Sequence, residues 1–186
     1  ASDRGRTGVE SPSTLGIEVS TAPERIVRDL FVEHARSIHT YAARRVGSDL
    51  AEDVLAETFR RVLESYERFD PDRGSHRAWL FGIATNVMHK HRRTEARRLR
   101  ALARAAAQLA PVVASDAERE LSLVLEAIER LAVEDRDLLV LVAWERMTRT
   151  EVAAALGIPV GTVRSRLHRI RAVLDAARHE RGGATR

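Results

Sequence analysis

Hydrophobic residues recur three or four positions apart through most of this chain, which is the period of an α-helix. Stretches that alternate β-branched and polar residues, as strands do, are scarce, and the helix-favouring residues Ala, Leu, Arg and Glu dominate. We therefore expect an all-α fold. The predicted helices cover about residues 24–47, 48–66, 77–98, 118–131, 134–144, 148–156 and 160–174.

Two local signals mark boundaries in the first half of the chain. Ser48 is the expected N-terminal cap of the helix that follows it, because its hydroxyl can accept a hydrogen bond from an unpaired backbone N–H. Residues 69–76, FDPDRGSH, contain Pro71 and Gly74 among polar side chains and predict a loop.

The helical pattern is clearest in residues 147–174, MTRTEVAAALGIPVGTVRSRLHRIRAVL. Thr148 and Glu151 have the spacing of a capping box, which predicts a helix start. Gly157 is suited to end that helix in the left-handed conformation, and Pro159 is suited to the entrance of the next. The second helix should bury one stripe, made of Val163, Leu167, Ile170 and Leu174. This stretch predicts a helix-turn-helix.

The outward face of the second helix carries the chemistry expected of a DNA-binding surface. An arginine can bind a guanine edge with two hydrogen bonds in the major groove, and neighbouring cations can hold phosphates. The alternative is an ordinary solvated basic helix, which we consider the less common use of such a helix. The candidate duplex-binding residues are Arg164, Ser165, Arg166, His168 and Arg169.

Interruptions in the pattern divide the chain into two small helical domains joined by a flexible linker. Residues 1–23 are rich in Gly, Ser, Thr and Pro and should be disordered. Residues 24–98 form the expected first domain, and residues 99–117, rich in alanine with one proline, the linker. The expected second domain, which contains the helix-turn-helix, covers residues 118–180, and residues 181–186 form a tail.

The distribution of charge matters more than its total. The 186 residues contain 31 Lys and Arg against 27 Asp and Glu, yet cations cluster near the end of the first domain, where seven between Lys90 and Arg104 face only Glu95. Such a cluster suits nucleic-acid phosphates. Arginine supplies every cation except Lys90, which favours bidentate contacts or equally reflects a G·C-rich coding genome.

Composition also excludes several classes of protein. The absence of cysteine excludes disulfides, thiolate zinc sites and a cysteine nucleophile. Histidines lack zinc-site spacing and no Gly-rich phosphate loop is present, so we expect no catalytic residue, metal or cofactor. No apolar run is long enough for a membrane helix or a signal peptide, which predicts a cytoplasmic protein without membrane insertion.

Four stretches in this order and spacing resemble the extracytoplasmic-function (ECF) family of bacterial RNA polymerase sigma factors, over about residues 24–178. The two in the first domain are AEDVLAETFRRVLESYERFD from Ala51 and RAWLFGIATNVMHKHRR from Arg77. The two in the second are LEAIERLAVEDRDLLVLVAWE from Leu125 and the helix-turn-helix. The resemblance implies a subunit that binds core RNA polymerase and directs it to promoters.

The resemblance also implies roles for the first domain. This domain should open and hold the minus-ten promoter element, with the loop at residues 69–76 capturing a base flipped from the non-template strand. Trp79 follows this loop among hydrophobic residues, so we favour a packing role for it over base stacking. The residues expected to bind the minus-ten element are His76, Arg77, Asn86, His89, Arg92 and Arg93.

Two acidic residues match the positions at which the family docks on the largest polymerase subunit. Asp53 and Glu57 lie one helical turn apart, where like charges cost a few tenths of a kcal/mol. A basic partner would relieve that cost. The family usually has a glutamine where this chain has Ala56, which removes one polar contact. The second domain should bind the duplex minus-thirty-five element, and an anti-sigma factor is the expected regulator.

Two other classes of protein fit part of the sequence. A dimeric helix-turn-helix regulator with an N-terminal sensing domain accounts for the second domain but leaves the basic end of the first unexplained. A protein that only binds another protein, such as an inhibitor of a sigma factor, would make the basic helix incidental. Specific duplex binding by the free chain would favour the regulator, since a sigma factor needs core polymerase to bind its promoter well.

Overall fold

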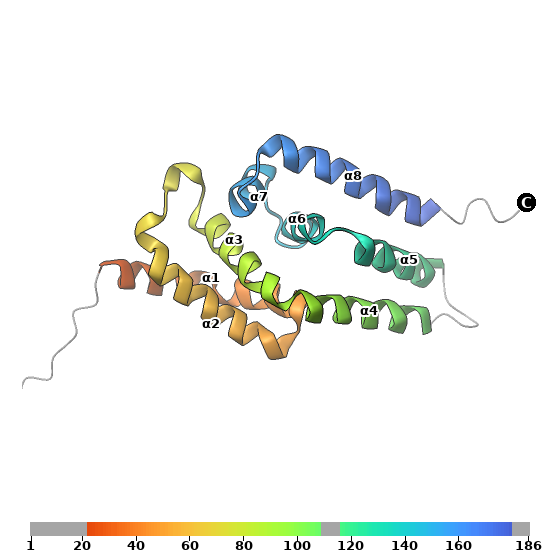
Figure 1. The fold of residues 1–186 in the computed structure, drawn as a ribbon, viewed down its shortest axis with the longest axis horizontal. Helices are drawn as coiled ribbons and strands as arrows, with labels where there is room; N and C mark the ends of the chain where they lie inside the picture. Colours follow the sequence, from red (N-terminus) through yellow and green to blue (C-terminus); the bar gives the residue numbers. More distant parts are fainter. Residues whose placement is uncertain (1–21, 109–115, 180–186) are drawn as a thin grey trace, which may run out of the picture.

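The structure, a computed structural model, describes residues 22–108 and 116–179, and within them eight α-helices and three 3₁₀ turns but no strand (Figure 1). The all-α prediction is confirmed. The first half contains α1 (Ala22–Val46), α2 (Ser48–Ser65), η1 (Tyr66–Arg68), η2 (Pro71–Arg73), α3 (His76–Met88), η3 (His89–His91) and α4 (Arg92–Gln108). The second contains α5 (Asp116–Arg130), α6 (Val133–Ala143), α7 (Arg149–Leu156) and α8 (Val160–His179).

The N-terminal domain, α1 to α4, is built on an antiparallel pair of helices, α1 and α2, joined through Gly47. Gly47 has φ of 99°, a conformation that favours glycine. The predicted capping role of Ser48 is wrong, because Ser48 is already helical and Gly47 holds the cap position without a side-chain hydrogen bond. The core of this domain includes Ile38, Tyr41, Val54, Val62, Leu80 and Phe81.

The loop predicted at residues 69–76 contains the 3₁₀ turn η2, and polar side chains cap both this turn and the start of α3. The Asp70 carboxylate accepts a hydrogen bond from the Asp72 N–H, beside Pro71 at the start of the turn. The Ser75 hydroxyl accepts one from the Ala78 N–H and so caps α3. These caps set the direction in which α3 leaves the loop.

The linker predicted at residues 99–117 is too long, because helix α4 covers much of it. The helix continues to Gln108, and α5 begins at Asp116. Ala103 is buried, and Arg100 Nε donates to Glu129 Oε1 across the two helices at 3.0 Å. Packing against α5 therefore extends the helix beyond the expected boundary. Residues 22 and 23, expected to be disordered, and residues 116 and 117, expected in the linker, are helical. The remaining residues of the linker, those of the disordered segment up to 21, and the whole tail lie outside the described residues.

The C-terminal domain, α5 to α8, contains the predicted helix-turn-helix. Thr148 and Glu151 form the expected capping box, and Gly157 ends α7 in the left-handed conformation with φ of 64°. Helix α8 buries Val163, Leu167 and Ile170, while Leu174 packs partly buried against the same core. Arg136 donates to the carbonyl oxygens of Glu129 and Leu131, which stabilises the junction between α5 and α6.

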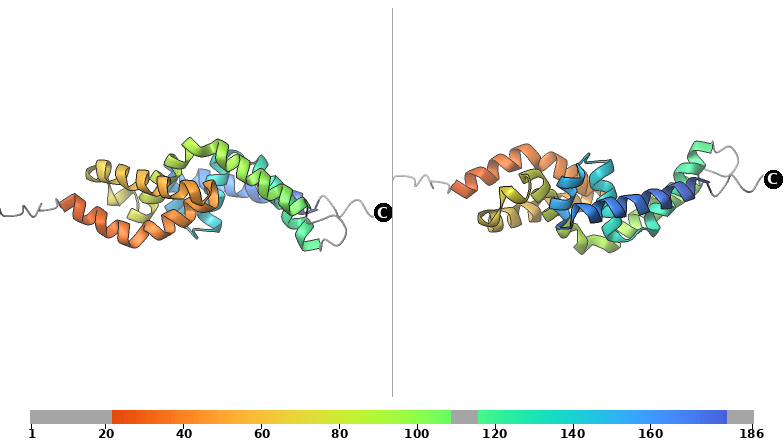
Figure 2. Two further views of the ribbon diagram at one scale, coloured as in Figure 1. Left: turned by 90° about the horizontal axis from the view of Figure 1, so that it is seen from below. Right: turned by 90° about the horizontal axis from the view of Figure 1, so that it is seen from above.

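The two domains pack on each other through α3 and α7. A Cβ atom added at Gly82 of α3 would lie 2.3 Å from the carbonyl oxygen of Ala155 in α7, so the backbones approach as closely as glycine permits. At the other end, α4, α5 and α8 extend away together (Figure 2). The domains expected from the sequence are thus held against each other.

Candidate nucleic-acid interface

The solvent-facing side of α8 carries the predicted duplex-binding residues. Arg164, Ser165, His168 and Arg169 are exposed, whereas the hydrophobic stripe on the opposite side is buried. The Ser165 hydroxyl donates to the Thr162 carbonyl, 3.0 Å away, so at this point it faces its own helix. A continuous polar and cationic face therefore projects from the helix-turn-helix.

Asp135 of α6, which the sequence analysis did not single out, organises part of this face. Its side chain is 7% exposed, and Arg169 Nη2 donates to its Oδ2 at 2.8 Å. Arg166 Nη1 lies 3.8 Å from the other oxygen, so Arg166 is drawn toward α6 and half-buried. The Arg169 side chain nevertheless remains 64% exposed. Arg169 is held in place with much of its surface still accessible, which reduces the side-chain entropy lost on binding a ligand.

The loop at residues 69–76 is backed by a cluster of aromatic rings. The Phe69 and His76 rings stack with centroids 4.1 Å apart, and the Tyr66 ring lies nearly parallel to both, 6.0 Å from His76 and 6.2 Å from Phe69. Trp79 lies 5.1 Å from Phe69 and packs against the core, in agreement with its predicted packing role. His76 is therefore a half-buried member of a stacked cluster.

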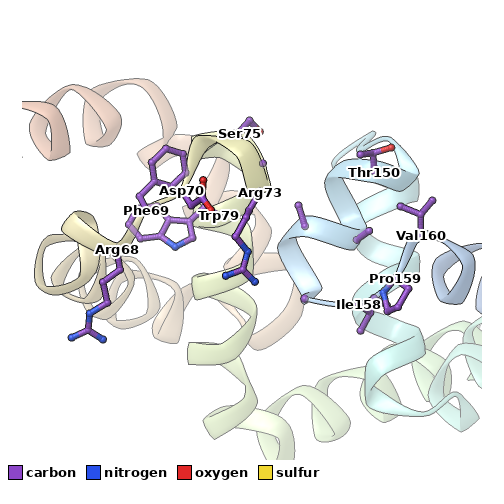
Figure 3. Close-up of a pocket in the computed structure, with 14 residues that line it drawn as sticks. Arg68, Phe69, Asp70, Arg73, Ser75, Trp79, Thr150, Ile158, Pro159 and Val160 are labelled. Carbon is purple, nitrogen blue, oxygen red and sulfur yellow. The ribbon is translucent and has the colours of Figure 1, made fainter.

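A cavity of about 640 Å³ lies between this loop and the turn of the helix-turn-helix (Figure 3). Phe69, Asp70, Arg73 and Trp79 line it from the N-terminal domain. The wall from the C-terminal domain consists of Thr150, Ala153, Ala154 and residues 157–160. The loop predicted to capture a base thus faces the other domain.

The predicted minus-ten residues on α3 and η3 lie in different surroundings. Asn86 is exposed, but the Arg77 Nη2 atom donates to the Glu145 carbonyl oxygen at 2.6 Å, and His89 Nε2 lies 2.7 Å from Asp137 Oδ2. Glu145 and Asp137 both belong to the C-terminal domain. The side chains of Arg92 and Arg93 lie outside the described part of the structure.

The pKa values of the two acidic neighbours of Arg77, Glu145 and Glu151, are shifted in opposite directions. Burial raises the pKa of Glu145, with Arg77 opposing the shift. The backbone N–H and hydroxyl of Thr148 lower the pKa of Glu151, so this carboxylate stays charged. Each acid has an oxygen 3.9 Å from the Arg77 guanidinium.

Neighbouring cations partly neutralise the negative charge on the acidic face of α2. Asp53 is exposed, whereas Glu57 accepts hydrogen bonds from Arg60 and Arg61 at 2.8–2.9 Å and lies 3.6 Å from Lys90 Nζ. The hydrogen bonds from Arg60 and Arg61 lower the pKa of Glu57 to about 2. The expected repulsion from Asp53 is therefore offset by local cations. Both arginines lie three or four positions from Glu57, a signal present in the sequence.

The part of the chain that the structure describes contains neither a candidate metal site nor a membrane-spanning helix. Among the described residues, no group of three or more His, Asp or Glu side chains could hold a metal ion. Within that same part, every helix is too short or too polar to span a bilayer.

Replacing both Arg60 and Arg61 by Gln should return the pKa of Glu57 from about 2 toward 4.5. In the wild type, the stabilisation from these hydrogen bonds is present above the unfolded-state pKa and is lost only as the pH falls toward the folded-state value. The Glu57 carboxyl chemical shift, followed by NMR during a pH titration, measures the change. Arg68→Gln is the control, and an unchanged Glu57 midpoint in the double variant would contradict the assignment.

Comparisons with known proteins agree with the division into two domains. The family described as Sigma-70 region 2 matches residues 30–98, and the family described as Sigma-70, region 4 matches residues 121–174. The chain is 31% identical over 155 residues to the ECF RNA polymerase sigma factor SigL of Mycobacterium tuberculosis, covering 80% of this chain and 86% of SigL.

A second relative supports the same family in sequence and in structure. RNA polymerase sigma factor CnrH of Cupriavidus metallidurans is 32% identical over 177 residues, covering 87% of this chain and 91% of CnrH. The solved structure of CnrH in complex with the cytosolic domain of CnrY matches with a TM-score of 0.57 and 29% identity, over 82% of this chain and 86% of that one. Both regions, in the same order and on a shared fold, show that this chain belongs to the ECF family of RNA polymerase sigma factors.

Proposed function

We propose that the chain recruits core RNA polymerase to a set of promoters, with residues 24–98 binding polymerase and the minus-ten element and residues 118–180 binding the minus-thirty-five element. The exposed cationic face of α8, backed by a buried hydrophobic stripe in a capped helix-turn-helix, is the observation that carries this proposal. The chain has no catalytic part in it, since polymerase performs the chemistry, and it acts in the cytoplasm.

Arg164, Ser165, His168 and Arg169 bind the minus-thirty-five duplex in its major groove. Arg169 is the residue best prepared to bind a base edge, because Asp135 fixes its position at 2.8 Å while most of the side chain stays accessible. A planar guanidinium held in this way can form two hydrogen bonds with a guanine. Arg166, drawn toward Asp135 and half-buried, supports this face.

The loop at residues 69–76 and the side of α3 that follows it hold the opened minus-ten strand. Unstacking a base costs a few kcal/mol, and a stacked cluster of aromatic rings beside the loop offers a surface on which a base recovers part of it. Beyond the loop, the strand is bound first at the start of α3, by Arg77, and then near the end of α3 and after it. The residues there are Asn86, His89, Arg92 and Arg93.

The acidic face of α2 docks on polymerase. Glu57 stays ionised through its arginine pairs, and Asp53 is exposed one turn away, so this face presents fixed negative charge to a basic partner.

A protein inhibitor of the anti-sigma class holds the chain inactive. The complex of the relative CnrH with CnrY supports a protein partner for this chain as well.

Run-off transcription with core RNA polymerase on a genomic promoter pool tests the function. We expect discrete transcripts that core polymerase alone does not produce, and weak binding of promoter duplex by the free chain. Tight, sequence-specific duplex binding by the free chain without new transcripts would instead support a conventional helix-turn-helix regulator.

Arg169→Ala should cost about 1–3 kcal/mol in promoter binding and relax base preference at one position, because one bidentate base contact is lost. Transcripts selected from a promoter library with a randomised minus-thirty-five element measure both effects. Arg130→Ala removes an exposed cation of α5, outside the helix-turn-helix, and is the control. A uniform loss across all sequences would show that Arg169 contacts phosphate only.

Asp53→Lys should weaken binding of core polymerase about tenfold, or ~1.4 kcal/mol, because it places a cation against a basic partner. Titration of labelled chain with core polymerase measures the affinity. Glu33→Lys makes the same change of charge at an exposed position of α1 and should leave binding unchanged. Equal affinities for the two variants would remove the docking role of α2.

A further inference from the structure

Helix α6 places a buried acid beside two arginines of α8. The Asp135 side chain is 7% exposed, and its Oδ2 atom accepts a hydrogen bond from Arg169 Nη2 at 2.8 Å. Arg166 Nη1 lies 3.8 Å from the other oxygen, Oδ1, which accepts no hydrogen bond from the described residues. One carboxylate therefore faces two cations that lie one turn apart on α8.

The start of α6 fixes the position of this carboxylate. Asp135 lies in the first turn of the helix, where unpaired backbone N–H groups favour a negative charge. The next residue, Arg136, donates to the carbonyl oxygens of Glu129 and Leu131 and so ties the start of α6 to the end of α5. Asp135 is thus a rigid anchor for the longer arginine side chains.

The contact with Arg169 contributes little to holding α8 in the domain. Val163, Leu167 and Ile170 already bury the opposite side of α8. An ion pair in which the Arg169 side chain is 64% exposed adds little stability. A negative charge this close to the outward face also repels phosphates. Stability alone therefore does not explain an acid at position 135.

The Arg169 guanidinium keeps enough donors to bind a base. An arginine has five N–H donors, and Asp135 takes one of them, so two remain available for the N7 and O6 acceptors of a guanine. The Arg166 side chain, by contrast, is 29% exposed and is turned toward Oδ1 of Asp135. Asp135 so holds one arginine in a fixed orientation on the outward face and keeps the other back from it.

We propose that Asp135 is a positioning residue that determines specificity: it fixes Arg169 for one base edge and withholds Arg166 from the phosphates, at the expense of affinity for duplexes of any sequence. The inference rests on the proposed binding of duplex DNA by α8. Without the carboxylate, both arginines are free to move onto the nearest phosphates. Such contacts strengthen binding but carry no sequence information.

Asp135→Asn tests the proposal, because it keeps the shape of the side chain and removes its charge. Glu134→Gln is the matched control, since it removes the same charge from an exposed residue in the same turn of α6. Titration of each full-length chain into a fluorescein-labelled duplex of mixed sequence, at several salt concentrations, measures general affinity. Sequencing the duplexes that each chain selects from a randomised pool, alone and with core polymerase, measures base preference.

For Asp135→Asn we expect preference at one base position to fall about tenfold, the size of one bidentate contact. Affinity for the mixed-sequence duplex should rise about twofold, because one repulsive charge is gone. The slope of log affinity against log salt should steepen by about one unit for each arginine that reaches a phosphate. Glu134→Gln should show at most the small rise in affinity. A contact that only supported the fold would give losses for every sequence instead.

Circular dichroism checks that each variant is folded, and Asp135→Ser takes the place of Asp135→Asn if the latter does not fold. Three results would overturn the inference: an unchanged base preference in the folded variant, an equal loss of affinity for all duplexes, and a wild-type chain that selects no base in either form.

Run-off transcription by the wild-type chain with core polymerase separates this inference from the proposed function. A chain that gives no transcripts, but whose base preference falls in Asp135→Asn, would uphold the role of Asp135 and contradict the sigma-factor function. Transcripts from the wild type together with an unchanged preference in Asp135→Asn would do the reverse.

Discussion

The buried guanidinium of Arg45 joins the parts of this molecule. It lies in α1 and binds Glu95 of α4 and Asp137 of α6, so a single side chain ties three helices and both domains together. Burial alone lowers the pKa of Arg45, but Tyr41, Asp137 and Glu95 raise it overall, and the group remains a cation. Removing one partner of such a buried pair costs about 3–5 kcal/mol, which makes this position intolerant of change.

The close approach of α3 and α7 decides what else the two domains can share. Because Gly82 lets the backbone of α7 come so near, Arg77 and His89 reach oxygens of the C-terminal domain at hydrogen-bond distance. With a larger residue at position 82, these polar side chains would face solvent. The packing at Gly82 therefore sets the distance between the two domains, and the polar contacts of Arg77 and His89 can form only at that distance.

Most features of this fold that depend on neighbouring residues could be predicted from the sequence, although the cap predicted at Ser48 was wrong, and those that depend on distant residues could not. The capping box at Thr148, the left-handed Gly157 and the buried stripe of α8 are local, and each is confirmed. His89 and Asp137 are 48 positions apart, and no periodic pattern links them. The arginine pairs of Glu57 also lie at helical spacing, so the sequence carried the signal for them as well as for the repulsion between Glu57 and Asp53.

Two buried acids of helix α6 make contacts on opposite sides of the helix. Asp135 and Asp137 are two positions apart, so on a helix they point in nearly opposite directions, and both are buried. Asp135 faces α8 and holds Arg169 within the C-terminal domain, while Asp137 faces the N-terminal domain. The position of Arg169 on α8 therefore depends on a contact within the C-terminal domain, whereas the contacts of Asp137 depend on the packing of the two domains.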